Sequence, residues 1–103
     1  MRQFDVCENP SPRSRAYAPF VVILQSHLLD AAPTCVVAPL LNAEGRRAYT
    51  EVSAEVVFQE KAYIVSIAEL AAIERRLLDG PVGSLLAFED GIRRAMDRLF
   101  TGF

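Results

Sequence analysis

Apolar and polar residues alternate along two neighbouring stretches in the second half of the chain, residues 52–58 and 61–67. A period of two is typical of strands, because successive side chains point to opposite faces of a sheet. The polar residues between the two stretches, Gln59 and Glu60, are expected to form a tight turn. This part of the chain therefore predicts an antiparallel hairpin.

Three further strands are predicted in the first half of the chain. Residues 3–7 alternate between polar and apolar, and residues 35–38 form a short apolar run. Residues 20–24 are apolar without interruption, which predicts a strand buried on both faces. Pro39 is expected at the end of its strand or on a sheet edge, because proline donates no hydrogen bond to a neighbouring strand.

The segments between these strands carry proline, serine, asparagine and glycine, which are typical of turns and loops. Residues 8–15 are predicted to form an exposed loop, residues 26–34 a turn, and residues 42–45 another turn.

The last part of the chain predicts an amphipathic helix over residues 84–100. Ser84 is expected to cap its first turn, and Glu89 precedes Arg93 by four residues, the favourable order for a helical ion pair. Gly91 inside this helix indicates either a close approach by another backbone or a plain surface glycine. The apolar positions recur at spacings of three and four: Leu85, Phe88, Ile92, Ala95, Met96 and Leu99.

Strands followed by one terminal helix predict a small, mainly β, α+β or β-barrel domain. The chain has 103 residues, so a second hydrophobic core would not fit and one domain over residues 1–103 is expected. Residues 68–79 match neither period and leave their structure open. The apolar share of 51% excludes a disordered chain.

The charge of the chain argues against general nucleic-acid binding. Eleven basic and thirteen acidic residues give a formal net charge of −2, and basic residues occur at most two in a row. A general nucleic-acid binder carries a basic excess or stripe. The apolar stretches are too short for a transmembrane helix, and the first residues lack a secretory signal, so a cytoplasmic protein is expected.

The residue types that carry catalysis or bind metals are sparse. Cys7 and Cys35 are two cysteines without a CxxC motif, and they are expected to be free and buried. His27 is the single histidine, and it lacks the motif that accompanies a nucleophilic triad. With one histidine and two distant cysteines, neither a metal site nor a cofactor is expected.

Two segments stand out from a purely structural sequence. The polar loop over residues 8–15 carries Arg13 and Arg15, and the chain ends on an aromatic residue, Phe103, shortly after Phe100. Chain ends are usually polar and frayed. The two terminal rings either pack back on the core or form an anchor for a partner, since aromatic residues dominate interface energetics.

Taken together, four segments resemble the CcdB family of toxins. They are residues 3–6, residues 20–30, residues 37–40, and the terminal helix with its ending, residues 95–103. The resemblance covers nearly the whole chain and includes the order of the elements and the length. It implies an SH3-like small barrel of antiparallel strands with one C-terminal α-helix.

The resemblance also implies a function. CcdB-like proteins are homodimeric toxins of toxin–antitoxin modules that bind the DNA gyrase A subunit and trap the cleaved-DNA complex. They are not enzymes. A CcdA-like antitoxin neutralises them through a disordered segment, and the two proteins together repress their own operon. Nucleic acid is therefore expected to be contacted only through gyrase or the antitoxin.

The family's gyrase contact maps onto Thr101, Gly102 and Phe103. Gly102 matches the family pattern and Phe103 keeps the apolar character, but Thr101 stands where the family has a tryptophan, and this chain contains none. The resemblance assigns antitoxin binding to the loop after the first strand. That set is Asn9, Ser11, Arg13, Ser14 and Arg15, in a loop that is longer and richer in proline than the family's.

Two other functions stay open at this point. One is a MazF-like endoribonuclease on the same fold, in which Arg13, Arg15 and Arg46 or Arg47 would line an RNA groove. The other is a non-toxic CcdB homologue that folds and binds its antitoxin. The lost tryptophan at Thr101 favours the second, whereas the near-neutral charge argues against the first.

Overall fold

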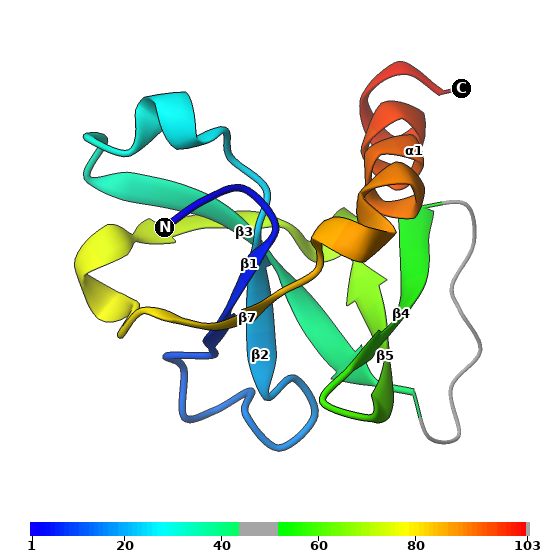
Figure 1. Ribbon diagram of the computed structural model, residues 1–103, viewed down its shortest axis with the longest axis horizontal. Coiled ribbons are helices and arrows are strands. Elements are labelled where there is room, and N and C mark those ends of the chain that lie inside the picture. The colour runs from blue at the N-terminus through cyan, green and yellow to red at the C-terminus, as the bar shows by residue number, and fades with distance from the viewer. Residues whose placement is uncertain (44–51, 103) are drawn as a thin grey trace.

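A computed structural model describes residues 1–43 and 52–102 of the chain. Its strands form one curled antiparallel sheet, and α1 packs at the end of the sheet that β4 borders (Figure 1). The elements are β1 (Asp5–Glu8), β2 (Phe20–Ile23), η1 (His27–Leu29), β3 (Thr34–Asn42), β4 (Ser53–Phe58), β5 (Lys61–Ser66), η3 (Ile67–Glu69), β6 (Ala71–Glu74), η4 (Arg75–Leu77), β7 (Pro81–Ser84), η5 (Leu86–Phe88) and α1 (Glu89–Thr101), where η marks a 3-10 turn. This half-barrel with a C-terminal helix confirms the predicted mainly β, α+β fold class.

Strand β3 connects the two parts of the sheet. The strand order is β4-β5-β3-β2-β1-β7, and β6 pairs with β3 outside this path. Along one edge of β3, residues 34–37 pair with β6 and residues 40–42 pair with β5, while the other edge pairs with β2. The sheet can therefore curl around β3, because its two ends have different partners on that edge.

The predicted hairpin is confirmed. Strands β4 and β5 pair over their whole length, and buried and exposed side chains alternate along β4. Gln59 and Glu60 at the turn both adopt positive φ angles, 51° and 64°. Positive φ at both central residues is the backbone of the turn that matches the twist of a two-stranded ribbon.

The expectation for Pro39 is wrong, since β3 continues through it to Asn42. Pro39 lies opposite Val21 of β2. On the other edge of β3 it falls between the residues that pair with β6 and those that pair with β5. The missing proline N–H therefore costs no hydrogen bond to either of those strands.

The predicted helix starts too early. Ser84 belongs to β7, where it pairs with Asp5, and the Leu85 N–H donates to the Phe4 carbonyl at 2.8 Å. The Ser84 hydroxyl accepts from the Leu86 N–H, but the N-cap residue is Leu85 in the short turn η5 and Phe88 in α1, which begins only at Glu89. The expectation that Ser84 caps the helix is therefore wrong. The ion pair between Glu89 and Arg93 is present at 3.2 Å.

The open segment over residues 68–79 contains two 3-10 turns and the edge strand β6. Its alanines show no alternation because three of the four β6 side chains are exposed and the fourth is only half-buried. The main core cluster lies between the sheet and α1, and its fully buried large side chains include Phe4, Leu40, Ile67, Leu85 and Ile92. A second buried cluster contains Ile23, both cysteines and Leu78.

Replacing either of two glycines by alanine is expected to change the free energy of unfolding, in opposite directions. A Cβ on Gly83 would overlap the buried ring of Phe58, which packs edge-on against Phe20. We expect Gly83→Ala to lower the free energy of unfolding by about 1–3 kcal/mol through overpacking. A Cβ on Gly91 would meet only the Ala54 methyl, at 4.0 Å. Gly91→Ala should therefore raise it by up to about 1 kcal/mol, because alanine favours the helix.

Urea denaturation of the two variants and the parent chain measures both effects. Equal destabilisation by the two substitutions would show that α1 lies closer to β4 than described.

Candidate functional site

The last turn of α1 carries two of the three residues assigned to gyrase contact. The Thr101 hydroxyl donates to the Asp97 carbonyl at 2.6 Å, and the Gly102 N–H donates to the Arg98 carbonyl at 3.0 Å. Gly102 has a φ of 80°, the left-handed conformation that ends many helices. Both residues are exposed, and Phe103 lies outside the described residues.

The apolar face of α1 continues beyond the sheet that it covers. Ile92 and Ala95 are fully buried, whereas Leu99 is 37% exposed and Phe100 is 70% exposed. In Figure 1 the final turns of the helix (red) rise above β4. The Phe100 ring therefore does not pack back on the core, and the end of α1 presents apolar surface to solvent.

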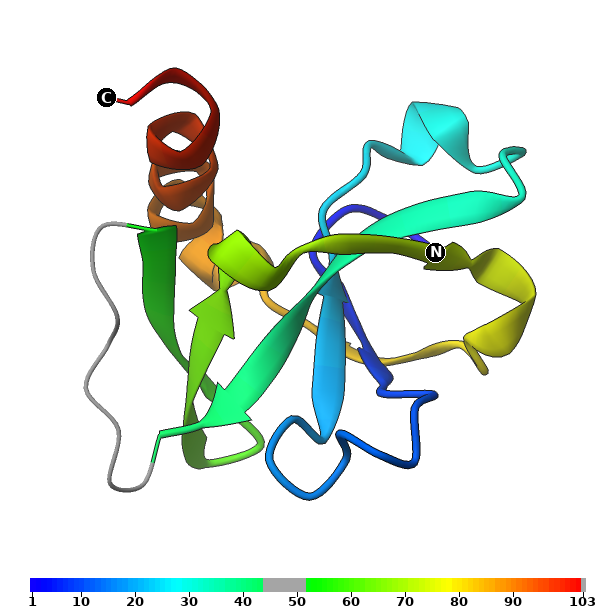
Figure 2. The same ribbon diagram turned by 180° about the vertical axis from the view of Figure 1, so that it is seen from behind.

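A second apolar projection lies on η1, which sequence reasoning treated as part of a plain turn. Leu28 is 83% exposed and Leu29 is 53% exposed. Two adjacent leucines between polar residues in a turn were the signal that the sequence offered. Both views show η1 and the end of α1 rising from the same end of the molecule, on either side of the N-terminal segment (Figures 1 and 2).

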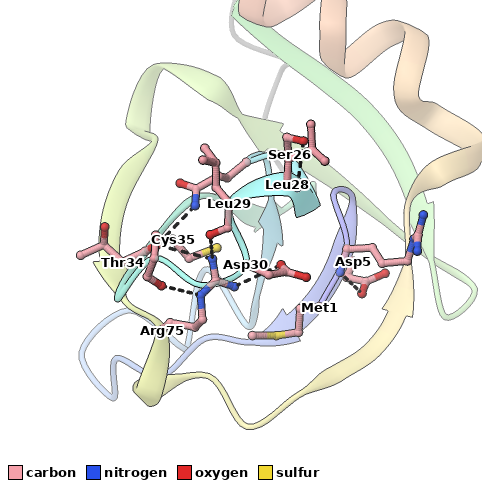
Figure 3. A network of polar contacts seen from close by, with 12 residues as sticks. Met1, Asp5, Ser26, Leu28, Leu29, Asp30, Thr34, Cys35 and Arg75 are labelled. Carbon is pink, nitrogen blue, oxygen red and sulfur yellow. Dashed lines mark hydrogen bonds and ion pairs between the residues drawn. The ribbon is translucent and has the colours of Figure 1, made fainter.

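Arg75 holds η1 and the following turn in place (Figure 3). Its guanidinium donates to the carbonyls of Ala32 at 2.9 Å, Leu29 at 3.3 Å and Thr34 at 3.5 Å, and it lies 3.8 Å from the Asp30 carboxylate. The Ser26 hydroxyl accepts from the Leu28 N–H and caps the turn. The exposed leucines are thus presented by a fixed backbone, which lowers the entropy lost when a partner binds.

The loop between β1 and β2 holds the residues assigned to antitoxin binding. The prediction of an exposed loop is wrong for Asn9, which is buried. Its side-chain amide donates to the Ser14 hydroxyl and the Ala18 carbonyl, both at 2.7 Å, and its side-chain oxygen accepts from the Ser11 N–H at 3.0 Å. Asn9 therefore organises the loop and offers no polar group to a partner.

The two arginines of this loop differ. Arg15 donates from Nε to the Asn9 carbonyl at 2.7 Å and from Nη2 to the Pro10 carbonyl at 3.4 Å, so it closes the loop. Arg13 is exposed and contacts no acidic group in the part of the chain that the structure describes. Among the five assigned residues, Arg13 is the one best placed to contact an acidic partner.

Cys7 and Cys35 are free and buried, as expected. Burial, with the Asp5 carboxylate and Cys35 nearby, raises the pKa of the Cys7 thiol to about 11. Burial also raises the pKa of Cys35, against the opposing effect of Arg75. Thiolates are the reactive form of cysteine, so these thiols are unreactive in the folded chain.

His27 is exposed on η1. Over residues 1–43 and 52–102, no group of three or more histidine, cysteine or acidic side chains is arranged to hold a metal ion. Within the same ranges, no helix is both long and apolar enough to cross a membrane.

The family model of the CcdB protein matches residues 3–102, nearly the whole chain. The chain belongs to the CcdB family. This membership implies an antitoxin as partner and makes the chain a toxin of a toxin–antitoxin system. No curated protein matches this CcdB-family chain.

Solved structures resemble it in fold. The Mycobacterium tuberculosis toxin MazF-mt6 has a TM-score of 0.72 and 19% sequence identity, over 96% of this chain and 96% of that chain. The crystal structure of an Mtb toxin has a TM-score of 0.66 and 23% identity, over 81% of this chain and 92% of that one. At these sequence identities the likeness shows the fold alone, which this CcdB-family chain shares with both of these toxins.

Arg75 is expected to be the residue that keeps the η1 leucines in position. Arg75→Ala would leave three carbonyls without their charged donor and lower the free energy of unfolding by about 1–3 kcal/mol. Arg76→Ala is the matched control, because Arg76 is exposed and pairs with the exposed Glu74; its expected effect is within about 0.5 kcal/mol.

Chemical denaturation checks the difference, and faster amide hydrogen exchange over residues 27–34 in Arg75→Ala would locate it. Similar stabilities for the two variants would contradict this role for Arg75.

Proposed function

We propose that this CcdB-family toxin poisons DNA gyrase by binding its A subunit at the end of α1. Thr101, Gly102 and Phe103 are the assigned contact residues. The observation that carries the proposal is the exposed apolar surface of the last helical turn, where Phe100 is 70% exposed. Exposed aromatic side chains on a soluble domain favour a protein-binding surface.

The leucines of η1 extend the proposed surface. Leu28 and Leu29 rise from the same end of the molecule as Phe100 (Figures 1 and 2). We propose that the chain acts as a homodimer, which would present this surface twice to a symmetric target. Because the proposed target is DNA gyrase, we place the toxin in the cytoplasm. On this proposal the toxin acts by binding and is not an enzyme, and together with the antitoxin it represses its own operon.

Thr101 occupies the position of the family tryptophan and has no ring to offer. Its hydroxyl is directed back to the Asp97 carbonyl. The adjacent Phe100 supplies an exposed ring one position earlier in the helix. We therefore place the aromatic part of the gyrase contact on Phe100 in this chain, with Thr101 as a neighbour that leaves room for it.

Removal of residues 101–103 is expected to abolish toxicity while the fold and antitoxin binding persist, because Thr101 and Gly102 are exposed and belong to no buried cluster. Phe100→Ala should lower the affinity for the gyrase A subunit by about tenfold or more, the effect of losing an interface anchor. Val57→Ala is the matched control, since Val57 is also apolar and exposed but lies on β4 near the hairpin turn.

For each variant, growth is measured in cells after induction. Gyrase supercoiling and DNA cleavage are measured with the purified proteins. Full toxicity of the truncated chain would contradict the assigned site. RNA cleavage by the purified chain, with gyrase unaffected, would instead support the MazF-like endoribonuclease. Antitoxin binding without either activity would identify a non-toxic homologue. Arg46 and Arg47, assigned to the RNA groove, lie outside the described residues.

For the antitoxin we propose a CcdA-like partner that contacts the loop after β1, with an acidic segment meeting Arg13. Arg13→Glu is expected to weaken antitoxin binding by about tenfold, since it replaces an attraction by a repulsion. Arg94→Glu makes the same charge change on the exposed face of α1 and serves as control. Calorimetric titration of the antitoxin into each toxin variant measures the effect, and equal affinities would refute the assignment.

A further inference from the structure

A small cavity lies between η1 and the start of α1, apart from the residues assigned to gyrase or antitoxin. Its volume is about 230 Å³, and its lining comes from the N-terminal segment, η1, β7, η5 and α1. The N-terminal segment (blue) runs between η1 (cyan) and the first turn of α1 (orange) in both views (Figures 1 and 2). Segments far apart in the sequence therefore meet around this cavity.

Hydrogen-bond donors converge on the cavity from three of these segments. Arg2 comes from the N-terminal segment, His27 from η1, and Arg93 from α1. The Ser84 hydroxyl also lines it; its oxygen accepts from the Leu86 N–H, so its own hydrogen is available to donate. The donor set is that of an oxyanion site, in which arginine and histidine surround carboxylate or phosphate oxygens.

Arg93 is fixed in place before any ligand binds. Its guanidinium lies over the Phe4 ring, 5.2 Å from the ring centroid. Nε donates to the Glu89 carboxylate at 3.2 Å and Nη2 to the Gln3 side-chain oxygen at 3.4 Å. Gln3 in turn donates to the Leu24 carbonyl at 2.8 Å. A guanidinium held by stacking and two hydrogen bonds loses little entropy when its remaining N–H groups bind an anion.

The two acidic side chains at the cavity are already engaged. One Asp5 oxygen accepts from the backbone N–H of Arg2 at 2.8 Å, and one Glu89 oxygen accepts from the Arg93 guanidinium. Asp5 and Glu89 offset the formal charges of Arg2 and Arg93, so they moderate the attraction for an anion. Their removal should therefore strengthen anion binding, which gives the site a signature of its own.

Phe4 at the cavity has a strained backbone. It is fully buried and has a φ of 71°, a backbone angle that residues other than glycine rarely adopt. Its N–H donates to the Ile23 carbonyl at 2.7 Å and its carbonyl accepts from the Leu85 N–H at 2.8 Å, so the surrounding strands impose this conformation. Strain of this kind concentrates at binding sites, where it places neighbouring side chains.

From this geometry we propose that the cavity binds an oxyanion, a carboxylate or a phosphate group, held by Arg2, His27 and Arg93. Two sources share this chemistry, an acidic side chain of a docked protein and a free phosphate. The proposal concerns the free chain and small anions, so it stands or falls separately from gyrase poisoning.

The test is a titration of the ¹⁵N-labelled full chain with sodium phosphate and, separately, with sodium acetate, at constant ionic strength set with sodium chloride. The expected result is saturable shifts in the amide signals of Gln3, Asp5 and Arg93. Arg93→Gln should weaken binding by about tenfold, the loss of a charge-assisted contact. Arg94→Gln, its neighbour outside the cavity, is the control and should change the affinity less than about twofold.

Glu89→Gln separates an anion site from a merely structural cluster. It removes a negative charge at the cavity, so an oxyanion should bind at least about twofold more tightly. Thermal unfolding of every variant confirms that the fold persists. Binding of phosphate alone points to a free phosphate, and binding of acetate with the same dependence on Arg93 points to an acidic side chain. Unsaturable shifts, equal effects of the two arginine substitutions, or weaker binding in Glu89→Gln would overturn the proposal.

Discussion

The double pairing of β3 is the constraint on which the structure depends. One strand of nine residues pairs with β2 on one edge and, on the other, with β6 over its first half and β5 over its second half. The hairpin that supports α1 and the segment that carries Arg75 are therefore both attached to β3. The two apolar projections, η1 and the end of α1, inherit their places from this strand, because each is held by an element that β3 positions.

Rigid support and exposed apolar surface occur together in this chain. A chain of 103 residues has a thin margin of stability, and buried leucine or phenylalanine would add to it. Leu28 and Phe100 are instead largely exposed. Leu28 lies on a turn that Arg75 holds in place, and Phe100 lies where α1 extends past the sheet. Apolar side chains kept out of a small core add nothing to its stability, and exposed apolar patches of this kind favour a protein-binding surface.

The spacing of apolar residues along the chain predicted the elements whose form depends on neighbouring residues. The β4–β5 hairpin follows from its alternation, and the amphipathic stripe of α1 follows from its spacing. The helix start at Ser84 was wrong because that residue pairs with Asp5, a partner 79 positions earlier that no local pattern reveals. In the candidate site, Thr101 and Gly102 were assigned through the resemblance, and their role stays a prediction. The exposure of Leu28 was not predicted because only tertiary contacts decide whether a leucine is buried. The burial of Asn9 was not predicted because burial of a loop amide is likewise a tertiary property.

The two buried thiols have a practical consequence. Folded molecules shield Cys7 and Cys35 completely, and the raised pKa of about 11 for Cys7 keeps that sulfur in its unreactive form. A thiol-specific dye can then label only molecules in which the buried cluster around these sulfurs has opened, since both cysteines pack there with Leu78 and Ile73. The labelling rate would measure how often this cluster opens. The two native cysteines can therefore report local opening of the toxin, in the free chain and in its complexes, without an added labelling site.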